Sequence, residues 1–231
     1  MKKVFAFVML AIALLSLTLS GCATYSAKGV MPNLNDPSTL AAKDKLITKA
    51  EDGVTITVYP VTNEDEVKKF FDEDLLDKKI LPVFIQIQNE SENTEIVGAI
   101  LYDKDNSFSA MTPGDLYAVI KRDWVARATY WMFQTYFIGA PISAAATHYT
   151  NTKIQEDLGV NGESGKLLRF GKISKEGTKG FLCFKQLDKK SPEENNQKES
   201  KEKYQEKSQG KMKLIFQRNS QLFQCIFDLS I

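Results

Sequence analysis

Apolar and polar residues alternate along several segments of the chain, which is the pattern of strands that bury one face. The segments with this pattern are 53–59, 82–89, 94–102, 166–170, 180–186, 212–217 and 222–229. The last two are separated by Arg218–Gln221, which predicts a hairpin with a four-residue loop. The hydropathy pattern therefore predicts a fold built mainly from antiparallel β-strands.

Two short helices are predicted from capping signals. Asn63 followed three residues later by Glu66 is a capping-box pattern, and it predicts a helix over 64–72. Asp36-Pro37 offers a cap and a proline at the first helical position, which predicts a second short helix that ends near Glu51.

A pair of longer helices is predicted in the middle of the chain. Thr112-Pro113 supplies a hydroxyl cap and a proline at the first position, and the helical pattern continues to about Ile138. Gly139-Ala140-Pro141 is expected to break this helix, and Pro141 to begin another that reaches Leu158. These residues predict an α-helical hairpin, 113–158, inserted into the β fold.

A charged tract, 188–211, precedes the last two predicted strands. It is rich in Lys, Glu, Gln and Ser and contains no aliphatic residue. Such a segment buries too little apolar surface to offset the entropy of ordering. We expect a low-complexity loop there.

The first residues have the plan of an export signal. Lys2 and Lys3 precede an apolar run, Val4 to Leu19, which ends in small residues. A segment of this kind directs a chain out of the cytoplasm, so residues 1–21 are expected to be a signal peptide.

The end of this signal, Leu19-Ser20-Gly21-Cys22, resembles the lipobox of bacterial lipoproteins. The resemblance implies cleavage before Cys22 and attachment of diacylglyceryl and further acyl chains such as palmitate to that residue. Ala23 rather than Asp after the cysteine implies the outer membrane and a periplasmic setting, and 22–39 is expected to be a lipidated tether. The alternative is a plain signal peptide with an incidental cysteine.

The predicted domain, 40–231, carries a second resemblance. A Gly-Val strand at 53–54, an acidic helix ending in Phe70-Phe71, and Leu81-Pro82-Val83 followed by alternating Ile residues are similar to uncharacterised bacterial lipoproteins. Those proteins have an immunoglobulin-like sandwich. The expected fold class is therefore α+β, a mainly antiparallel Ig-like β-sandwich with an inserted α-helical hairpin.

Composition excludes several function classes. The balance of 30 basic against 29 acidic residues argues against a nucleic-acid partner. One histidine and three cysteines make a multi-histidine or cysteine-rich metal site implausible. The glycine-rich stretch 159–166 lacks the spacing and the hydroxyl of a phosphate-binding loop. We expect no cofactor, no metal site and no catalytic residue.

Two cysteines remain if Cys22 is acylated. Cys183 and Cys225 could form a disulfide in an exported protein. The alternative is two reduced thiols, because Cys225 shares a strand face with apolar residues whereas Cys183 shares its face with Lys185.

An uncharged aromatic segment is the strongest functional signal in the chain. Ala128 to Thr147 has no formal charge. Its candidate contact residues for a membrane or partner are Tyr130, Trp131, Phe133, Tyr136 and Phe137. They could pack within the domain, contact lipid or an envelope protein, or belong to a membrane span.

These patterns together predict a lipid-anchored cell-envelope protein with a non-enzymatic binding or structural role at the membrane. One alternative is a carrier of a hydrophobic ligand, whose pocket the aromatic helices would form. The other is a cell-wall hydrolase that uses His148, the only histidine.

Overall fold

The computed structural model describes residues 25–51, 53–90, 94–103, 106–122, 139–162, 165–185 and 209–230. Contacts divide the chain into two compact units. We call Met1–Gly29 with Pro113–Gly165 the helical unit, and Val30–Thr112 with Lys166–Ile231 the β unit.

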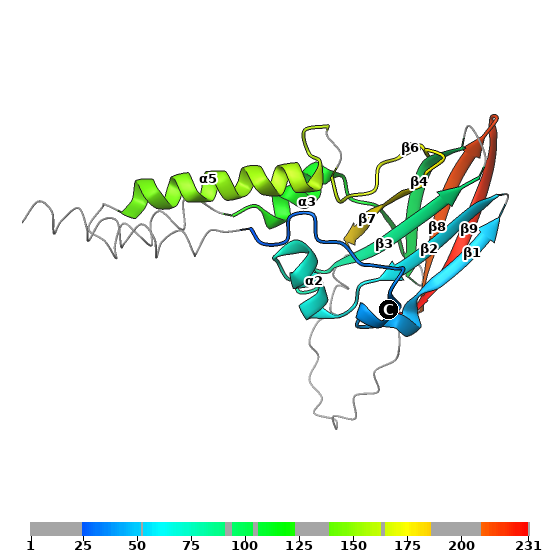
Figure 1. Ribbon diagram of the computed structural model, residues 1–231, viewed down its shortest axis with the longest axis horizontal. Helices are drawn as coiled ribbons and strands as arrows, with labels where there is room; N and C mark the ends of the chain where they lie inside the picture. The colour runs from blue at the N-terminus through cyan, green and yellow to red at the C-terminus, as the bar shows by residue number, and fades with distance from the viewer. Residues whose placement is uncertain are drawn as a thin grey trace, which may run out of the picture. The chain divides into compact units, whose positions relative to one another are not determined.

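The β unit contains two antiparallel sheets (Figure 1). The first has the strand order β1 (Ile47–Glu51), β2 (Val54–Pro60), β3 (Ile80–Asn89) and β7 (Thr178–Lys185). The second has the order β5 (Asn106–Ser109), β4 (Thr94–Asp103), β8 (Gln209–Arg218) and β9 (Gln221–Ser230), and β6 (Gly171–Lys172) also pairs with β4. Strands far apart in the sequence are therefore neighbours in both sheets, as in β3–β7 and β4–β8.

One hydrophobic core is shared by the two sheets. Because side chains point alternately to the two faces of a strand, every second residue of β2 and of β8 enters this core. The core includes Val54, Ile56 and Val58 from the first sheet and Met212, Leu214 and Phe216 from the second. The fold is a sandwich-like α+β arrangement of mostly antiparallel strands, which confirms the coarse prediction from hydropathy.

The opposite face of the first sheet is covered by α2 (Glu64–Phe71). As the capping pattern predicts, the Asn63 side chain accepts a hydrogen bond from the Glu66 amide at 3.0 Å. The rings of Phe70 and Phe71 pack on Phe181 of β7, with centroids 5.6 and 4.9 Å away. This second apolar layer fixes the helix on the sheet.

The helix expected up to Glu51 does not form. The chain instead makes two short 3₁₀ turns, Pro37–Thr39 and Lys43–Lys45, and then enters β1. The reason is a tertiary contact: the Ala41 amide donates to the Glu66 carboxylate at 3.3 Å and the Ala42 amide to the Tyr59 hydroxyl at 3.2 Å. These amides are therefore unavailable for helical hydrogen bonds.

The hairpin of β8 and β9 is tighter than predicted, and it shortens the expected loop 188–211. Arg218 pairs with Gln221, so the turn holds only Asn219 and Ser220, both with positive φ (48° and 67°). Positive φ at both central residues is the geometry of a type I′ turn. At its other end β8 already begins at Gln209, so 209–211 belong to a strand. The rest of the tract, 188–208, lies outside the described residues.

Residues 166–170, expected to be a strand, form only an isolated bridge. Leu167 pairs with Phe181, where the Phe181 amide donates to the Lys166 carbonyl and the Leu168 amide to the Phe181 carbonyl, both at 2.8 Å. Gly180 permits the close approach of these two backbone segments, because a Cβ there would lie 2.6 Å from the Leu168 amide nitrogen.

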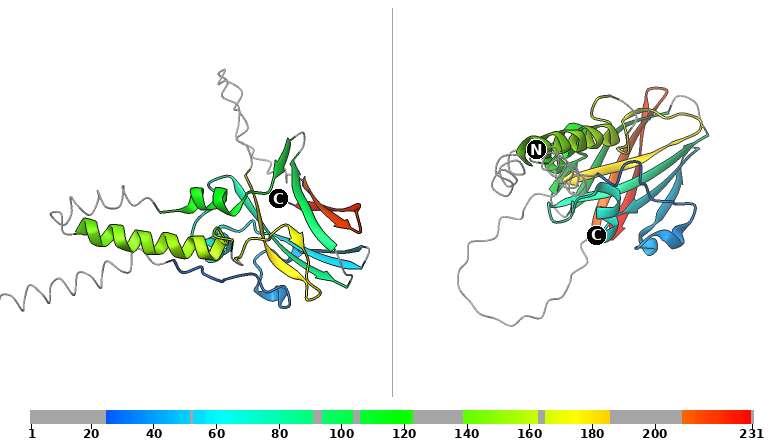
Figure 2. Two further views of the ribbon diagram at one scale, coloured as in Figure 1. Left: turned by 90° about the horizontal axis from the view of Figure 1, so that it is seen from above. Right: turned by 60° about the vertical axis from the view of Figure 1, so that its left-hand side comes forward.

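The helical unit contains α3 (Pro113–Ile120) and α5 (Gly139–Leu158), which lie side by side (Figure 2). The prediction of one helix from Pro113 to Ile138 is wrong, because α3 ends at Ile120. The Asn151 side chain of α5 accepts from the Arg122 amide at 2.8 Å and donates to the Arg122 carbonyl at 3.0 Å. These two bonds satisfy the backbone of Arg122 outside a helix. Gly139-Ala140-Pro141, expected to interrupt helical structure, is itself helical.

Candidate functional site

The first described residues are fastened to the C-terminal end of α5. The Tyr25 hydroxyl donates to one carboxylate oxygen of Asp157, and the Gly29 amide donates to the other at 2.7 Å. Tyr25, Ala27 and Asp157 are all buried. At the surface, Lys28 pairs with Glu156 at 2.7 Å, and this hydrogen bond raises the pKa of Lys28. We call these contacts of residues 25–29 with Glu156 and Asp157 the N-terminal clamp.

The N-terminal clamp includes part of the predicted tether, 22–39. Tyr25 and Ala27 of this stretch are buried, and Tyr25, Lys28 and Gly29 bond to the end of α5, whereas Ser26 is exposed. The backbone amide and the phenol hydroxyl that bind Asp157 come from positions that carry no sequence motif, so only the tertiary structure identifies them.

Replacing Asp157 with alanine is expected to open the clamp. The change leaves the buried Tyr25 hydroxyl and the Gly29 amide without their carboxylate, and a hydrogen bond to a charged group contributes about 1.5–3 kcal/mol. We expect hydrogen exchange of the Gly29 amide to accelerate roughly 10- to 100-fold, as 1.36 kcal/mol corresponds to a factor of ten.

Glu156→Gln is the matched control, because it removes the exposed ion pair and leaves both bonds to Asp157 in place. An exposed pair contributes little in water, so exchange at Gly29 should change far less. Equal acceleration in the two variants would contradict the assigned role of Asp157.

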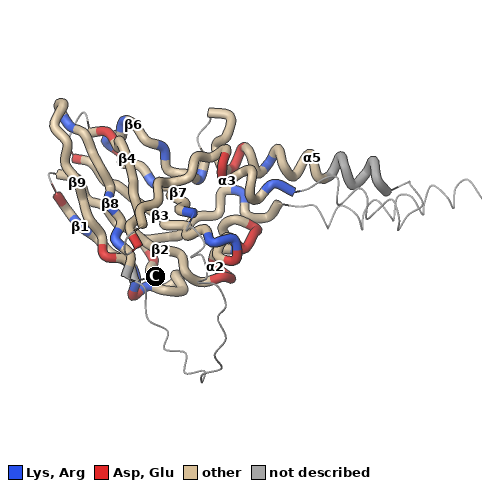
Figure 3. Tube along the Cα trace, turned by 180° about the vertical axis from the view of Figure 1, so that it is seen from behind, with Lys and Arg blue, Asp and Glu red and all other residues tan. Residues whose placement is uncertain are grey.

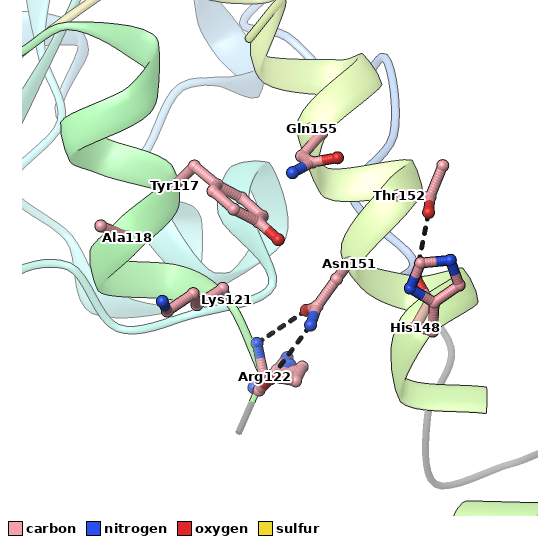
Figure 4. A pocket seen from close by; sticks show the side chains of 8 residues that line it. All are labelled: Tyr117, Ala118, Lys121, Arg122, His148, Asn151, Thr152 and Gln155. Atoms are coloured by element: carbon pink, nitrogen blue, oxygen red, sulfur yellow. Dashed lines mark hydrogen bonds between the residues drawn. The ribbon is translucent and has the colours of Figure 1, made fainter. Parts of the chain in front are cut away.

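A polar pocket of about 650 Å³ lies between α3 and α5 (Figure 4). The described residues that line it are Tyr117, Ala118, Lys121, Arg122, His148, Asn151, Thr152 and Gln155. Figure 4 shows Tyr117 on α3 and Gln155 on α5 pointing toward each other across it. The pocket belongs entirely to the helical unit.

Part of the polar lining of the pocket is already engaged in structural bonds. The Asn151 amide holds the Arg122 backbone, and the Thr152 hydroxyl donates to the His148 carbonyl at 3.1 Å. Arg122, beside Lys121, adds a second basic side chain to the lining, and Figure 3 shows the basic end of α3 in blue. None of the described residues that line the pocket is acidic.

His148, the residue expected of a hydrolase, lies among the described residues that line this pocket. Among those residues there is no serine, cysteine or carboxylate for the histidine to activate or be oriented by. Across the part of the chain that the structure describes, no group of three or more His, Cys, Asp or Glu could hold a metal ion. The aromatic residues expected to form the pocket of a hydrophobic-ligand carrier lie outside the described residues.

Cys183 and Cys225 are both buried free thiols. Cys225 belongs to the core between the sheets, together with Leu182 and Phe184 of β7. Cys183 alternates with these two residues and therefore faces the opposite side of its sheet, so the disulfide is not formed. Burial raises the pKa of the Cys183 thiol, which keeps it protonated and unreactive. The Cys225 thiol donates to Glu51 at 3.3 Å.

The other predicted site residues lie outside the described residues. These are the lipidation residue Cys22 and the aromatic residues Tyr130, Trp131, Phe133, Tyr136 and Phe137. Within the described ranges, no helix combines the length and hydrophobicity that crossing a bilayer requires.

No protein-family model, curated protein or solved structure matches the chain. The clamp and the pocket therefore rest on the geometry of this molecule alone. The pocket did leave a signal in the sequence, since His148, Asn151, Thr152 and Gln155 have the spacing of one helix face.

Proposed function

We propose that the protein is a lipid-anchored cell-envelope protein, with a non-enzymatic binding or structural role at the membrane surface. Cleavage after Gly21 would expose Cys22 for acylation, and Ala23 favours the outer membrane. Its partners would be membrane lipid, through the acyl chains, and an envelope protein. The lipobox supports this proposal from the sequence.

The N-terminal clamp is the observation that carries the proposal furthest. Tyr25 follows Cys22 by three residues, and a chain step spans at most about 3.6 Å, so their Cα atoms lie within about 11 Å of each other. Acyl chains on Cys22 would be buried in the bilayer. The end of α5 that binds Tyr25 is then held beside the lipid headgroups.

The aromatic residues between α3 and α5 fit this placement. Trp131 and Phe137 belong to the helical unit by sequence, and large aromatic side chains favour the membrane–water interface. We further propose that α3, α5 and the residues between them form the inserted hairpin, and that the two sheets have immunoglobulin-like topology. The chain passes from one antiparallel sheet to the other, and this supports the immunoglobulin-like topology.

The proposal is tested by measuring how close α5 lies to the headgroups in the acylated protein. Tyr149 is 62% exposed on α5, so Tyr149→Cys accepts a fluorophore while the buried Cys183 and Cys225 do not. In vesicles that carry a quencher on the lipid headgroup, we expect strong quenching of this fluorophore. Addition of Asp157→Ala should remove most of it, because an open clamp releases α5 from the anchor.

Glu156→Gln serves again as the control, and it should retain the quenching. Weak quenching in the acylated protein with an intact clamp would reject the placement of the helical unit at the membrane.

A further inference from the structure

The pocket between α3 and α5 is lined mainly by hydrogen-bonding residues. The buried apolar residues of the two helices are Leu116 and Ile120 of α3 and Ile154 and Leu158 of α5. The pocket is formed instead by the half-buried and exposed residues His148, Asn151, Thr152 and Gln155 of α5 with Tyr117 and Lys121 of α3. It is therefore a solvent-accessible hollow whose lining can hydrogen-bond a ligand.

Among the described residues, the basic side chains at the pocket are separate from the acidic side chains at the end of α5. Lys121 and Arg122 are at the pocket, whereas the two acidic residues near the end of α5 serve the N-terminal clamp. Glu156 pairs with Lys28, and Asp157 binds Tyr25 and Gly29. The described lining of the pocket is consequently basic, with neutral hydrogen-bonding groups among its cations.

These groups match the chemistry of a phosphate. Guanidinium and ammonium groups form charge-assisted hydrogen bonds with phosphate oxygens. The Tyr117 hydroxyl, the Gln155 amide and the His148 imidazole supply further hydrogen-bond donors around them. A volume of about 650 Å³ lies within the range of small-ligand pockets.

We propose that this pocket binds the phosphate group of an anionic lipid headgroup. The inference rests on the proposed function, because the clamp brings the pocket near the membrane. Thr152 precedes Asp157 by five residues, which is about 8 Å along a helix. The pocket then lies within roughly 30 Å of an acylated Cys22, when the chain span from Cys22 to Tyr25 and the side-chain contact of Tyr25 with Asp157 are included.

The test uses the mature-length chain, residues 22–231, with Cys22→Ala so that acylation does not mask weak binding. Its partition onto vesicles containing phosphatidylglycerol is compared with that of Lys121→Gln/Arg122→Gln. Each basic residue near an anionic surface contributes about 1 kcal/mol, or about 5-fold, so the double variant should bind roughly 25-fold more weakly. Vesicles of phosphatidylcholine alone should show little difference between the two proteins.

Lys172→Gln/Lys179→Gln is the matched control, because it removes the same charge from two exposed residues of the β unit. It should bind nearly as well as the unchanged pocket. Equal loss in both double variants would show general electrostatic attraction and overturn the site, as would unchanged binding of the pocket variant. Lys121→Gln alone, at an exposed position, repeats the test if the double variant unfolds.

A second measurement separates the two sources of phosphate. His148 is the only histidine, so its imidazole signals are unique in the NMR spectrum. A shift of these signals with glycerol phosphate at constant pH, without pocket-dependent vesicle binding, would assign the site to soluble phosphates and reject the lipid. Pocket-dependent vesicle binding, with or without that shift, identifies the headgroup. Weak headgroup quenching of the fluorophore at position 149 in the acylated protein with an intact clamp rejects the proposed function, whereas these measurements reject only the pocket.

Discussion

Cys22→Ser is expected to leave the protein without acyl chains, as an unprocessed or soluble product. A hydroxyl is a poor substitute for the thiol, which is the nucleophile that would form the thioether. Each buried methylene contributes about 0.8 kcal/mol, so two long chains together contribute on the order of 20 kcal/mol to membrane retention. Radiolabelled palmitate and membrane fractionation measure both effects.

Cys225→Ser is the control for this experiment, because it removes a buried thiol of β9 and leaves the predicted lipobox intact. It should incorporate palmitate like the unchanged protein. Palmitate still found on the Cys22→Ser protein would show that the acyl chains are elsewhere, and the lipobox prediction would then be wrong.

Phe181→Ala should cause the largest loss of folding stability among the substitutions considered. Phe181 is fully buried, and its ring packs against Phe70, Phe71 and Phe84, with Phe84 at a centroid distance of 5.0 Å. Truncating a buried phenylalanine costs about 3–5 kcal/mol through lost burial and the cavity that remains. The free energy of unfolding, measured with urea, should fall by about that amount, and the melting temperature by roughly 10 °C.

Phe223→Ala provides the comparison within the second sheet. Its ring stacks on Phe216 at 5.1 Å, but it is only half-buried. The loss should therefore be nearer 1–2 kcal/mol, since less apolar surface is removed from contact. A similar loss in both variants would show that the phenylalanine layer under α2 is not a well-packed second core.

Several of the predicted strands bury mainly one face, whereas β3 and β7 were also predicted although both of their faces are largely buried. β2, β4, β8 and β9 alternate apolar and polar residues because one face packs on the shared core. The start of α2 was also predictable, since Asn63 and Glu66 are close in sequence and form the cap by themselves. The alternation of apolar residues and the local helix cap both depend on residues that are close together in the chain, so both can be recognised from the sequence.

β1 and β5 had no comparable signal. All five residues of β1 are exposed or half-buried, and it is a strand because its backbone pairs with β2. β5 is only four residues long and pairs with β4. Edge strands of this kind depend on a partner strand rather than on their own hydropathy.

The candidate site likewise combines one feature that is visible in the sequence with contacts that only the tertiary structure shows. The polar spacing of His148, Asn151, Thr152 and Gln155 is visible in the sequence, but its meaning required a second helix opposite it. Asn151 ends α3 by bonding the Arg122 backbone, a contact across 29 positions. The carboxylate of Asp157 binds residues more than a hundred positions earlier.

The sequence by itself determined the α+β class and the sandwich strands with one buried face, and it predicts lipidation at Cys22. Each of these depends on periodicity or on a short run of neighbouring residues. Tertiary structure alone decided that Tyr25 is clamped to α5, that Cys225 lies between the two sheets while Cys183 faces the other side of the first sheet, and that polar residues of α3 and α5 line one pocket. Such features depend on long-range contacts, whose partners are chosen by packing and hydrogen bonding in the folded chain rather than by spacing along it.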